Sequence, residues 1–278
     1  MAIAPTVESL RRATAGWRAA GERVALVPTM GALHEGHLAL ARLACDRADR
    51  VVVSIFVNPT QFAPGEDFSS YPRTLEEDRR RLGGLADLIF TPAVEEMYPE
   101  GSATTVSVAG PAAAGLEDRF RPTHFQGVAT VVAKLLIQAM PDVAIFGEKD
   151  FQQLKIITRM ARDLHLPVRI LGGETVREPD GLALSSRNRY LSAGERATAP
   201  RLHAALEACA EAIRAGADPA KAAAEAGAAL AGAGFAIDYV QVRQAESLAP
   251  VDPPAHGPLR VLAAARLGRT RLIDNVAV

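Results

Sequence analysis

Two histidines, His34 and His37, follow a short apolar run near the start of the chain, within residues 28–37 (PTMGALHEGH). The apolar residues 24–27 end at a proline, and an amphipathic segment follows at residues 38–48. This pattern predicts a strand, a tight loop and a helix that begins at or near His37. The unpaired N–H groups of a first helical turn favour an anion, and two imidazoles add further donors. The segment therefore predicts a site for the phosphates of a nucleotide such as ATP.

Two other interpretations of this histidine pair stay open on the segment alone. The pair could bind zinc, but its spacing is i, i+3, whereas the zinc-binding HExxH motif places its histidines at i, i+4. No third ligand cluster stands out among the other four histidines. The pair could also be structural, with one histidine capping the helix and the other satisfied in the core.

Polar residues also follow the next predicted strand. In residues 56–62 (FVNPTQF), Asn58 and Gln61 offer uncharged donors and acceptors that suit a small polar substrate, although the motif also fits a plain Asn-Pro turn. In residues 71–78 (YPRTLEED), Thr74 and Glu77 match a helix capping box. Asp78 has no such explanation and is a candidate ligand for Mg²⁺, with Glu77 as the alternative.

Two further motifs contain groups that could bind phosphates. Residues 146–153 (FGEKDFQQ) contain Gly147 for close backbone approach, Lys149 as a point charge, Asp150 for a ribose hydroxyl and Gln153 one turn into a helix. The alternative is a surface Lys–Asp pair. Residues 181–190 (GLALSSRNRY) place two hydroxyls and two guanidiniums within five residues, which predicts a flexible polyphosphate clamp. A solvated loop is the alternative. The clamp residues are Ser185, Ser186, Arg187 and Arg189.

The order of the predicted elements indicates an α/β fold. Up to residue 173, apolar β-rich runs alternate with helical patterns, which predicts a Rossmann-like, doubly wound parallel sheet. The predicted strands are 24–27, 51–57, 86–90, 142–146 and 168–171, and the predicted helices are 38–48, 75–82, 125–139 and 151–164. We therefore expect residues 1–173 to form the domain that binds the nucleotide and the substrate.

The pattern changes after residue 173. A capping box at Ser192 and Glu195 opens a helix that is predicted to continue through Arg214, and a second alanine-rich helix follows the turn at 216–219. Two strands are predicted at residues 237–242 and 259–265. Residues 174–278 should therefore form a small α+β domain that closes over the active site.

Composition excludes some classes of function. The 278 residues carry a formal net charge of −1, so no electrostatic grip on nucleic acid or on an anionic membrane is expected. No apolar run reaches the length of a membrane span, and the N-terminus lacks the apolar core of a signal peptide. Cys45 and Cys209 lie in apolar helical patterns without metal-ligand spacing, and we expect buried, reduced thiols. These features predict a cytoplasmic protein.

Taken together, the motifs PTMGALHEGH, FVNPTQF, GEKDFQQL and SSRNRYLS resemble those of the pantoate–β-alanine ligase (pantothenate synthetase) family. This family belongs to the nucleotidyltransferases with an HxGH motif and a KMSKS-like loop. The resemblance runs from residue 24 to about 190 almost without gaps, and the remainder fits the family's small second domain. One departure is Leu184, where methionine is common; the exchange conserves volume and changes little.

The resemblance implies a cytoplasmic, AMP-forming ligase, commonly a homodimer, that uses ATP and Mg²⁺. Pantoate and ATP would give pantoyl adenylate and pyrophosphate, and β-alanine would then release AMP and pantothenate. The implied catalytic residues are His34, His37, Lys149, Ser185 and Arg187. The implied ATP site adds Pro28, Thr29, Met30, Gly147, Asp150, Val176 and Ser186. Pantoate would be bound by Gln61 and Gln153, with Asn58 and Met30 nearby; Arg121 and His124 would lie towards β-alanine, and Asp78 would hold magnesium.

Two competing functions share part of this pattern. A simple nucleotidyltransferase has the HxGH motif and the basic loop, but the FVNPTQF motif and the Gln152–Gln153 pair disfavour it. A catalytically idle nucleotide sensor is disfavoured because both histidines, Lys149 and the Ser-Ser-Arg loop are retained. The products distinguish them: AMP from a ligase, pyrophosphate without AMP from a transferase, and neither from a sensor.

Overall fold

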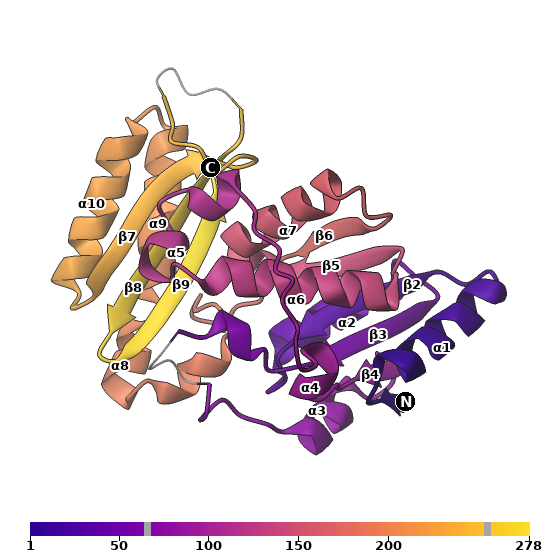
Figure 1. Cartoon of the computed structure of the whole chain (residues 1–278). Helices are drawn as coiled ribbons and strands as arrows, with labels where there is room; N and C mark the ends of the chain where they lie inside the picture. Colours follow the sequence, from indigo (N-terminus) through magenta and orange to yellow (C-terminus); the bar gives the residue numbers. More distant parts are fainter. Residues whose placement is uncertain (64–67, 253–256) are drawn as a thin grey trace.

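The larger of the two β-sheets in the described part of the chain has its strands parallel, in the order β1-β4-β3-β2-β5-β6 (Figure 1). This computed structural model describes residues 1–63, 68–252 and 257–278. The strands are β1 (Ala2–Ala4), β2 (Val24–Thr29), β3 (Arg50–Ile55), β4 (Leu88–Phe90), β5 (Val143–Gly147) and β6 (Arg169–Gly173). The predicted α/β class and parallel sheet are confirmed, with strand limits shifted by a few residues.

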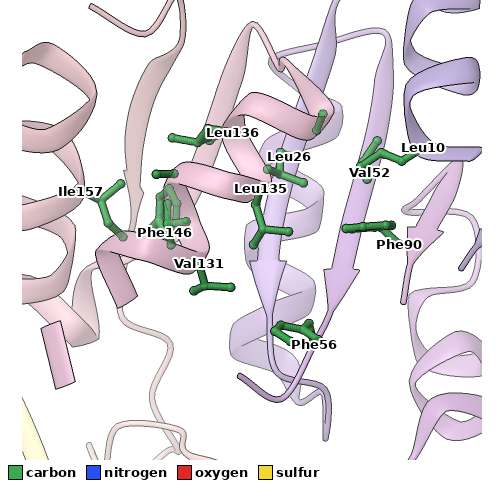
Figure 2. Close-up of a cluster of buried hydrophobic side chains, with 14 of the residues drawn as sticks. Leu10, Leu26, Val52, Phe56, Phe90, Val131, Leu135, Leu136, Phe146 and Ile157 are labelled. Carbon is green, nitrogen blue, oxygen red and sulfur yellow. The ribbon is translucent and has the colours of Figure 1, made fainter. Parts of the chain in front are cut away.

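Helices cover both faces of this sheet because successive strand residues point to opposite sides. On β2, Val24 and Leu26 belong to one buried cluster, and Ala25 and Val27 belong to another. The first cluster includes residues of α1 (Val7–Ala19), α6 (His124–Ala139) and α7 (Phe151–Asp163), as Figure 2 shows for part of it. The second includes residues of α2 (Glu35–Cys45) and α3 (Leu75–Leu82). Burial on both faces explains why the strands read as almost continuous apolar runs.

The strand order positions a binding site. β2 and β5 are neighbours in the sheet, although their paired residues Ala25 and Val143 lie far apart in the sequence. The order of the strands reverses at this point, since the chain runs from β2 to β4 on one side and from β5 to β6 on the other. Ligands of open α/β sheets bind at such a reversal, beside the carboxyl ends of the strands. The His34 motif follows β2, and the Lys149 motif follows β5.

A smaller antiparallel sheet lies beside the first and is backed by helices (Figure 1). Its described strands are β7 (Ala236–Gln244), β8 (Leu259–Leu267) and β9 (Thr270–Ala277), and its helices are α9 (Arg201–Arg214) and α10 (Pro219–Gly232). The α+β prediction is confirmed, but the described sheet has three strands where two were predicted. The missing strand, β9, carries Arg271, Asp274 and Asn275, which interrupt the apolar pattern.

Some local predictions are wrong for identifiable reasons. The single helix predicted through Arg214 is two helices, α8 (Ala193–Thr198) and α9, since Pro200 cannot donate the hydrogen bond that a continuous helix requires. The Ser192–Glu195 capping box is present as predicted. Both cysteines were predicted to be buried, and this is confirmed for Cys209 only. Cys45 is exposed because α2 turns Ala41 and Ala44 towards the sheet instead.

Short elements near the chain start and in connections were not predicted from the pattern. α1 buries only Leu10 and Thr14 deeply, and β1 has three residues, so neither gives a clear periodic signal. α4 (Val94–Met97) and α5 (Glu117–Phe120) are single turns. α5 is nonetheless important, since it packs against the smaller sheet (Figure 1). Among the described helices, none has the length and apolar character needed to cross a membrane.

Helix α6 approaches the residues after β3 very closely at Gly127. A Cβ atom there would lie 2.3 Å from the carbonyl oxygen of Thr60 and 2.8 Å from the Cα of Gln61. Gly127 therefore allows α6 to support the 3₁₀ turn η1 (Pro59–Gln61) directly.

We predict that Gly127→Ala lowers the free energy of unfolding by about 1–3 kcal/mol, because backbone rather than a flexible side chain must move. Gly16→Ala on α1 is the matched control. No atom lies within 4 Å of its added methyl group, so it should be neutral or stabilise by roughly 0.5–1 kcal/mol. Urea unfolding of both variants measures the difference. Equal stabilities would show that the close approach is not required.

Candidate active site

Two adjoining cavities lie beside the carboxyl ends of β2 and β5. The smaller measures about 230 Å³ and the larger, between the two sheets, about 700 Å³. Lys149, Gln153, Ser185 and Arg187 line both, so the two cavities adjoin, and together they are called the cleft below. The smaller cavity is lined by every site residue predicted above except Asp78, its alternative Glu77 and Arg189, namely Pro28, Thr29, Met30, His34, His37, Asn58, Gln61, Arg121, His124, Gly147, Lys149, Asp150, Gln153, Val176, Ser185, Ser186 and Arg187.

Helix α2 begins with reciprocal hydrogen bonds made by the two histidines. His34 is the N-cap residue, and its Nδ1 accepts from the backbone N–H of Gly36 at 3.2 Å. The backbone N–H of His34 in turn donates to Nδ1 of His37 at 3.3 Å. Gly36 is required here, because a Cβ would lie 2.9 Å from the His34 ring. This is a capping box in which imidazoles replace the usual hydroxyl and carboxylate.

These contacts determine where each ring holds its proton. A nitrogen that accepts a hydrogen bond is unprotonated, so each neutral imidazole has its proton on Nε2. Burial lowers the pKa of His34 to about 4, assisted by the charge of Lys149. Burial also lowers the pKa of His37 to about 3, with His34 as the next cause. Both rings are therefore neutral near pH 7, and each has an Nε2–H group to donate to a ligand.

Asp78 holds the loop that leads to these histidines. Its two carboxylate oxygens accept from the backbone N–H groups of Ala32, at 3.0 Å, and Leu33, at 2.7 Å. Thr74 Oγ1 also donates to the carboxylate, at 3.3 Å. The carboxylate stabilises an unusual conformation, since Ala32 has a φ of 49°.

This geometry does not fit the predicted magnesium role of Asp78. The residue is 1% exposed, its oxygens are occupied by backbone donors, and it lines neither cavity of the cleft. The alternative ligand, Glu77, pairs with Arg80 and Arg81 on the outer side of α3. The predicted Thr74–Glu77 capping box is also wrong, because Thr74 bonds to Asp78 instead. Within the described part of the chain, no group of three or more His, Cys, Asp or Glu residues could hold a metal ion.

Gln61 lies on a platform built by Asn58. The Asn58 side chain donates to Oε1 of Gln61 at 3.1 Å and accepts from Tyr98 Oη at 2.8 Å. Asn58 is 1% exposed, and its amide also donates to the Gly127 carbonyl at 3.3 Å. The structure thus makes Asn58 a support for Gln61; Asn58 also lines the smaller cavity, and its contact with substrate stays a prediction. The Nε2 group of Gln61 faces Met30 Sδ at 3.2 Å, a weak acceptor that a ligand can replace.

Arg121 and His124 close the same side of the cleft. His124 Nδ1 lies 2.9 Å from the Gln61 carbonyl, which only accepts, so this nitrogen carries the proton. Its Nε2 then accepts from Arg121 Nη1 at 3.1 Å. Burial lowers the pKa of His124 to about 4, with the Arg121 charge as the second cause. His124 is therefore neutral, with both ring nitrogens occupied, and it orients Arg121 towards the cleft.

The motif after β5 contains residues that line the smaller cavity and a residue that holds other parts of the chain. Lys149 lies in the 3₁₀ turn η3 (Glu148–Asp150), with its Nζ 4.0 Å from the Asp150 carboxylate. Gln153 lines both cavities. Gln152 does not act with it as a pair: it is 3% exposed, accepts from the backbone N–H of Glu117 at 2.9 Å and donates to the Pro111 carbonyl at 2.8 Å.

The residues of the predicted phosphate clamp lie in and just before a 3₁₀ turn. Ser185 caps the 3₁₀ turn η4 (Ser186–Tyr190), and its Oγ accepts from the backbone N–H of Arg187 at 3.3 Å. Just before it, Leu184 N–H donates to the Val176 carbonyl at 3.0 Å, which brings Val176 beside the clamp. Arg189 bonds to the Ser186 carbonyl at 3.0 Å and lines neither cavity.

Residues of the smaller sheet complete the cleft, and the motifs above do not include them. Arg271 of β9 forms two hydrogen bonds with the Glu117 carboxylate, at 2.6 and 2.8 Å, and Tyr239 donates to the same carboxylate at 2.9 Å. Asp274 and Asn275 of β9 line the larger cavity. The only sequence signal for these residues is the polar pair within the apolar segment 272–277 (LIDNVA).

Comparison with known proteins identifies the family. A family model described as pantoate-beta-alanine ligase matches residues 2–277. The chain is 60% identical to pantothenate synthetase of Bradyrhizobium sp. (strain BTAi1 / ATCC BAA-1182) over 277 residues, which cover 99% of this chain and 98% of that protein. The chain belongs to the pantoate–β-alanine ligase family. The match confirms the resemblance inferred from the four motifs.

Solved structures of pantoate–β-alanine ligases share this fold. The pantothenate synthetase of Thermus thermophilus superposes with a TM-score of 0.92, at 49% identity over 99% of both chains. The ligase of Francisella tularensis superposes with a TM-score of 0.82, at 32% identity over 99% of this chain and 97% of that one. The latter crystal structure is described as complexed with beta-gamma ATP and beta-alanine. Membership of this ligase family disfavours the simple nucleotidyltransferase and the idle sensor.

We predict that Asp78→Asn destabilises the ligand-free chain by about 1–3 kcal/mol. An amide has one accepting oxygen for two buried N–H groups, so one of them loses its partner. Glu77→Gln, on the exposed side of the same helix, should change stability by less than about 0.5 kcal/mol. Urea unfolding with EDTA and with added Mg²⁺ provides the measurement. If Asp78 were a magnesium ligand, the variant would be as stable as the parent in EDTA and would lose only a response to Mg²⁺.

Proposed function

We propose that this pantoate–β-alanine ligase is ATP-dependent and works through a pantoyl-adenylate intermediate, with pantothenate, AMP and pyrophosphate as products. The single observation that carries this proposal is the shared small cavity. It is lined by the donors suited to phosphates (His34, His37, Lys149) and by the two uncharged amides suited to pantoate (Gln61, Gln153). The ligand set described for the Francisella tularensis structure supports the same substrates.

In the first step, a pantoate carboxylate oxygen attacks the α-phosphorus of ATP. The new bond forms as the bond to the bridging oxygen breaks, and pyrophosphate leaves with that electron pair. Negative charge builds up around the α-phosphorus, where preorganised donors act most strongly. The Nε2–H groups of His34 and His37 supply neutral donors, while Lys149, Ser185 and Arg187 would hold the departing phosphates.

Uncharged partners suit the attacking carboxylate. A guanidinium clamp would stabilise the carboxylate itself and so reduce its nucleophilicity. Gln61 and Gln153 can instead bind pantoate through amide hydrogen bonds, and Asn58 fixes Gln61 at 3.1 Å. Holding the carboxylate close to the α-phosphorus supplies several kcal/mol of the barrier through proximity.

In the second step, the neutral amine of β-alanine attacks the activated carbonyl, and AMP leaves with the bonding electrons of the acyl–phosphate bond. The amine loses one proton as the amide forms. Arg121 would bind the β-alanine carboxylate, because His124 holds its guanidinium beside the Gln61 turn. His124 cannot take the amine proton while both its ring nitrogens are occupied.

Magnesium enters this proposal only as the counter-ion of ATP. The candidate ligand Asp78 does not fit, and Mg²⁺ commonly keeps several waters and binds substrate phosphates with few protein carboxylates. Asp150 would contact the ribose, next to the backbone of Gly147 and Val176. A homodimeric state and a cytoplasmic location remain predictions.

The reaction order provides the direct test. With Mg²⁺, ATP and pantoate, the chain should exchange labelled pyrophosphate into ATP without β-alanine, and exchange should stop when pantoate is omitted. Lys149→Ala should lower this exchange by at least about tenfold, as expected for the loss of a charged phosphate contact. Lys221→Ala, at an exposed position, is the control and should leave it unchanged. Exchange that strictly required β-alanine would contradict the adenylate mechanism.

The two adjacent glutamines should respond differently. We expect Gln153→Ala to weaken pantoate binding roughly tenfold or more while leaving ATP binding and stability unchanged, because it removes a ligand-facing amide. Gln152→Ala should instead lower the free energy of unfolding by about 1–3 kcal/mol, since buried partners lose their hydrogen bonds. Separate titrations of ATP and pantoate by calorimetry, with urea unfolding, measure both. If Gln153→Ala weakened only the binding of ATP, Gln153 would contact ATP and not pantoate, which would contradict the proposal.

A further inference from the structure

Strand β9 carries two adjacent polar residues in a buried position between the sheets. Asp274 and Asn275 are 4% and 3% exposed. Adjacent residues of a strand point to opposite sides, so the pair can reach two different parts of the chain. Buried polar groups of this kind are stable only with complete hydrogen bonding. Their partners are two separate segments of the phosphate site.

Asn275 holds the turn that carries Lys149. Its Nδ2 group donates to the carbonyl of Glu148 at 2.9 Å and to the carbonyl of Lys149 at 3.0 Å. Its Oδ1 accepts from Arg260 Nε at 2.6 Å, which fixes the orientation of the amide. Arg260 also pairs with the Glu148 carboxylate at 3.1 Å. The turn that carries Lys149 is therefore attached to two neighbouring strands of the smaller sheet, to β9 through Asn275 and to β8 through Arg260.

Asp274 holds the segment that leads to Ser185. Its carboxylate accepts from both Nη groups of Arg177, at 2.6 and 2.9 Å. Arg177 also donates to the Gly181 carbonyl at 3.1 Å, and its backbone pairs with that of Ala183. The segment 177–183 is thus a small closed hairpin whose base Asp274 anchors. Ser185 follows two residues later, so its position depends on this anchor.

We propose that Asp274 and Asn275 are positioning residues that fix the distance between Lys149 and the Ser185–Arg187 clamp. This inference rests on the proposed role of those groups in binding ATP phosphates. Lys149 follows β5 and the clamp follows β6, so the two belong to separate segments of the chain. β9 links these segments through two adjacent side chains on one rigid strand. These two anchors therefore set the affinity for ATP, whereas Gln61, in the turn η1 after β3, lies outside both of them.

Three conservative variants test this proposal. Asn275→Asp keeps the acceptor for Arg260 but removes the N–H groups that reach the two carbonyls. Asp274→Asn weakens the Arg177 pair. Asp238→Asn is the matched control: Asp238 pairs with Arg271 at 2.7 Å in the same sheet and lies outside both hydrogen-bonded anchors described above. Calorimetry measures the dissociation constants of a non-hydrolysable ATP analogue and of pantoate separately, and urea unfolding shows that each variant is folded.

We expect the first two variants to weaken binding of the ATP analogue roughly fivefold or more, with pantoate binding within about twofold of the parent. The control should bind both ligands like the parent. Unchanged ATP binding in folded Asp274→Asn would overturn the proposal, as would an equal loss for both ligands or an equal loss in the control. If Lys149→Ala also left ATP binding unchanged, the proposed function itself would fail. If ATP binding were weakened by Lys149→Ala but unchanged in the two β9 variants, only this inference would fail.

Discussion

The site depends on how helix α2 begins. Two backbone N–H groups that would otherwise lack partners donate to Nδ1 of His34 and Nδ1 of His37. These hydrogen bonds start the helix, orient both rings and leave the proton of each ring on Nε2. One local structure thus meets a folding requirement and provides two neutral donors at the end of β2. The glycine between the histidines is part of the same constraint, because any side chain there would meet the His34 ring.

Other parts of the molecule keep this helix start in place and build the rest of the site around it. Asp78, from the next crossover, holds the preceding loop by its backbone. Lys149 lies at the end of the neighbouring strand β5, where its charge contributes to the low pKa of His34. The smaller sheet reaches over from the other side and holds the backbone of Lys149 through Asn275. The charged donor Lys149 and the neutral donors His34 and His37 therefore line the same cavity, each held in place by other elements of the fold.

The sequence predicted the parallel sheet and the residues that line the smaller cavity, because both produce strong local patterns. Apolar strands buried on two faces are continuous runs, and Gln153 or Lys149 follow such runs directly. The supporting residues were harder to identify. The side chains of Asp78 and Asn58 suit ligand contacts, and only their hydrogen-bond partners in the structure show that Asp78 also holds backbone and that Asn58 also holds Gln61. β9 was missed because its two buried polar residues interrupt the apolar pattern, and their partners lie about a hundred or more residues away in the chain.

The central claim is that His34 and His37 are neutral Nε2–H donors, and nitrogen NMR of the ligand-free chain tests it directly. In ¹⁵N-labelled protein at pH 7, both rings should show a protonated Nε2 and an unprotonated Nδ1, with the signals assigned by His34→Gln and His37→Gln. Lowering the pH to 5.5 should leave both spectra unchanged, since the pKa values are about 4 and about 3. A proton on Nδ1 of either ring, or protonation of either ring with a midpoint near the ordinary value of about 6.5, would contradict the account.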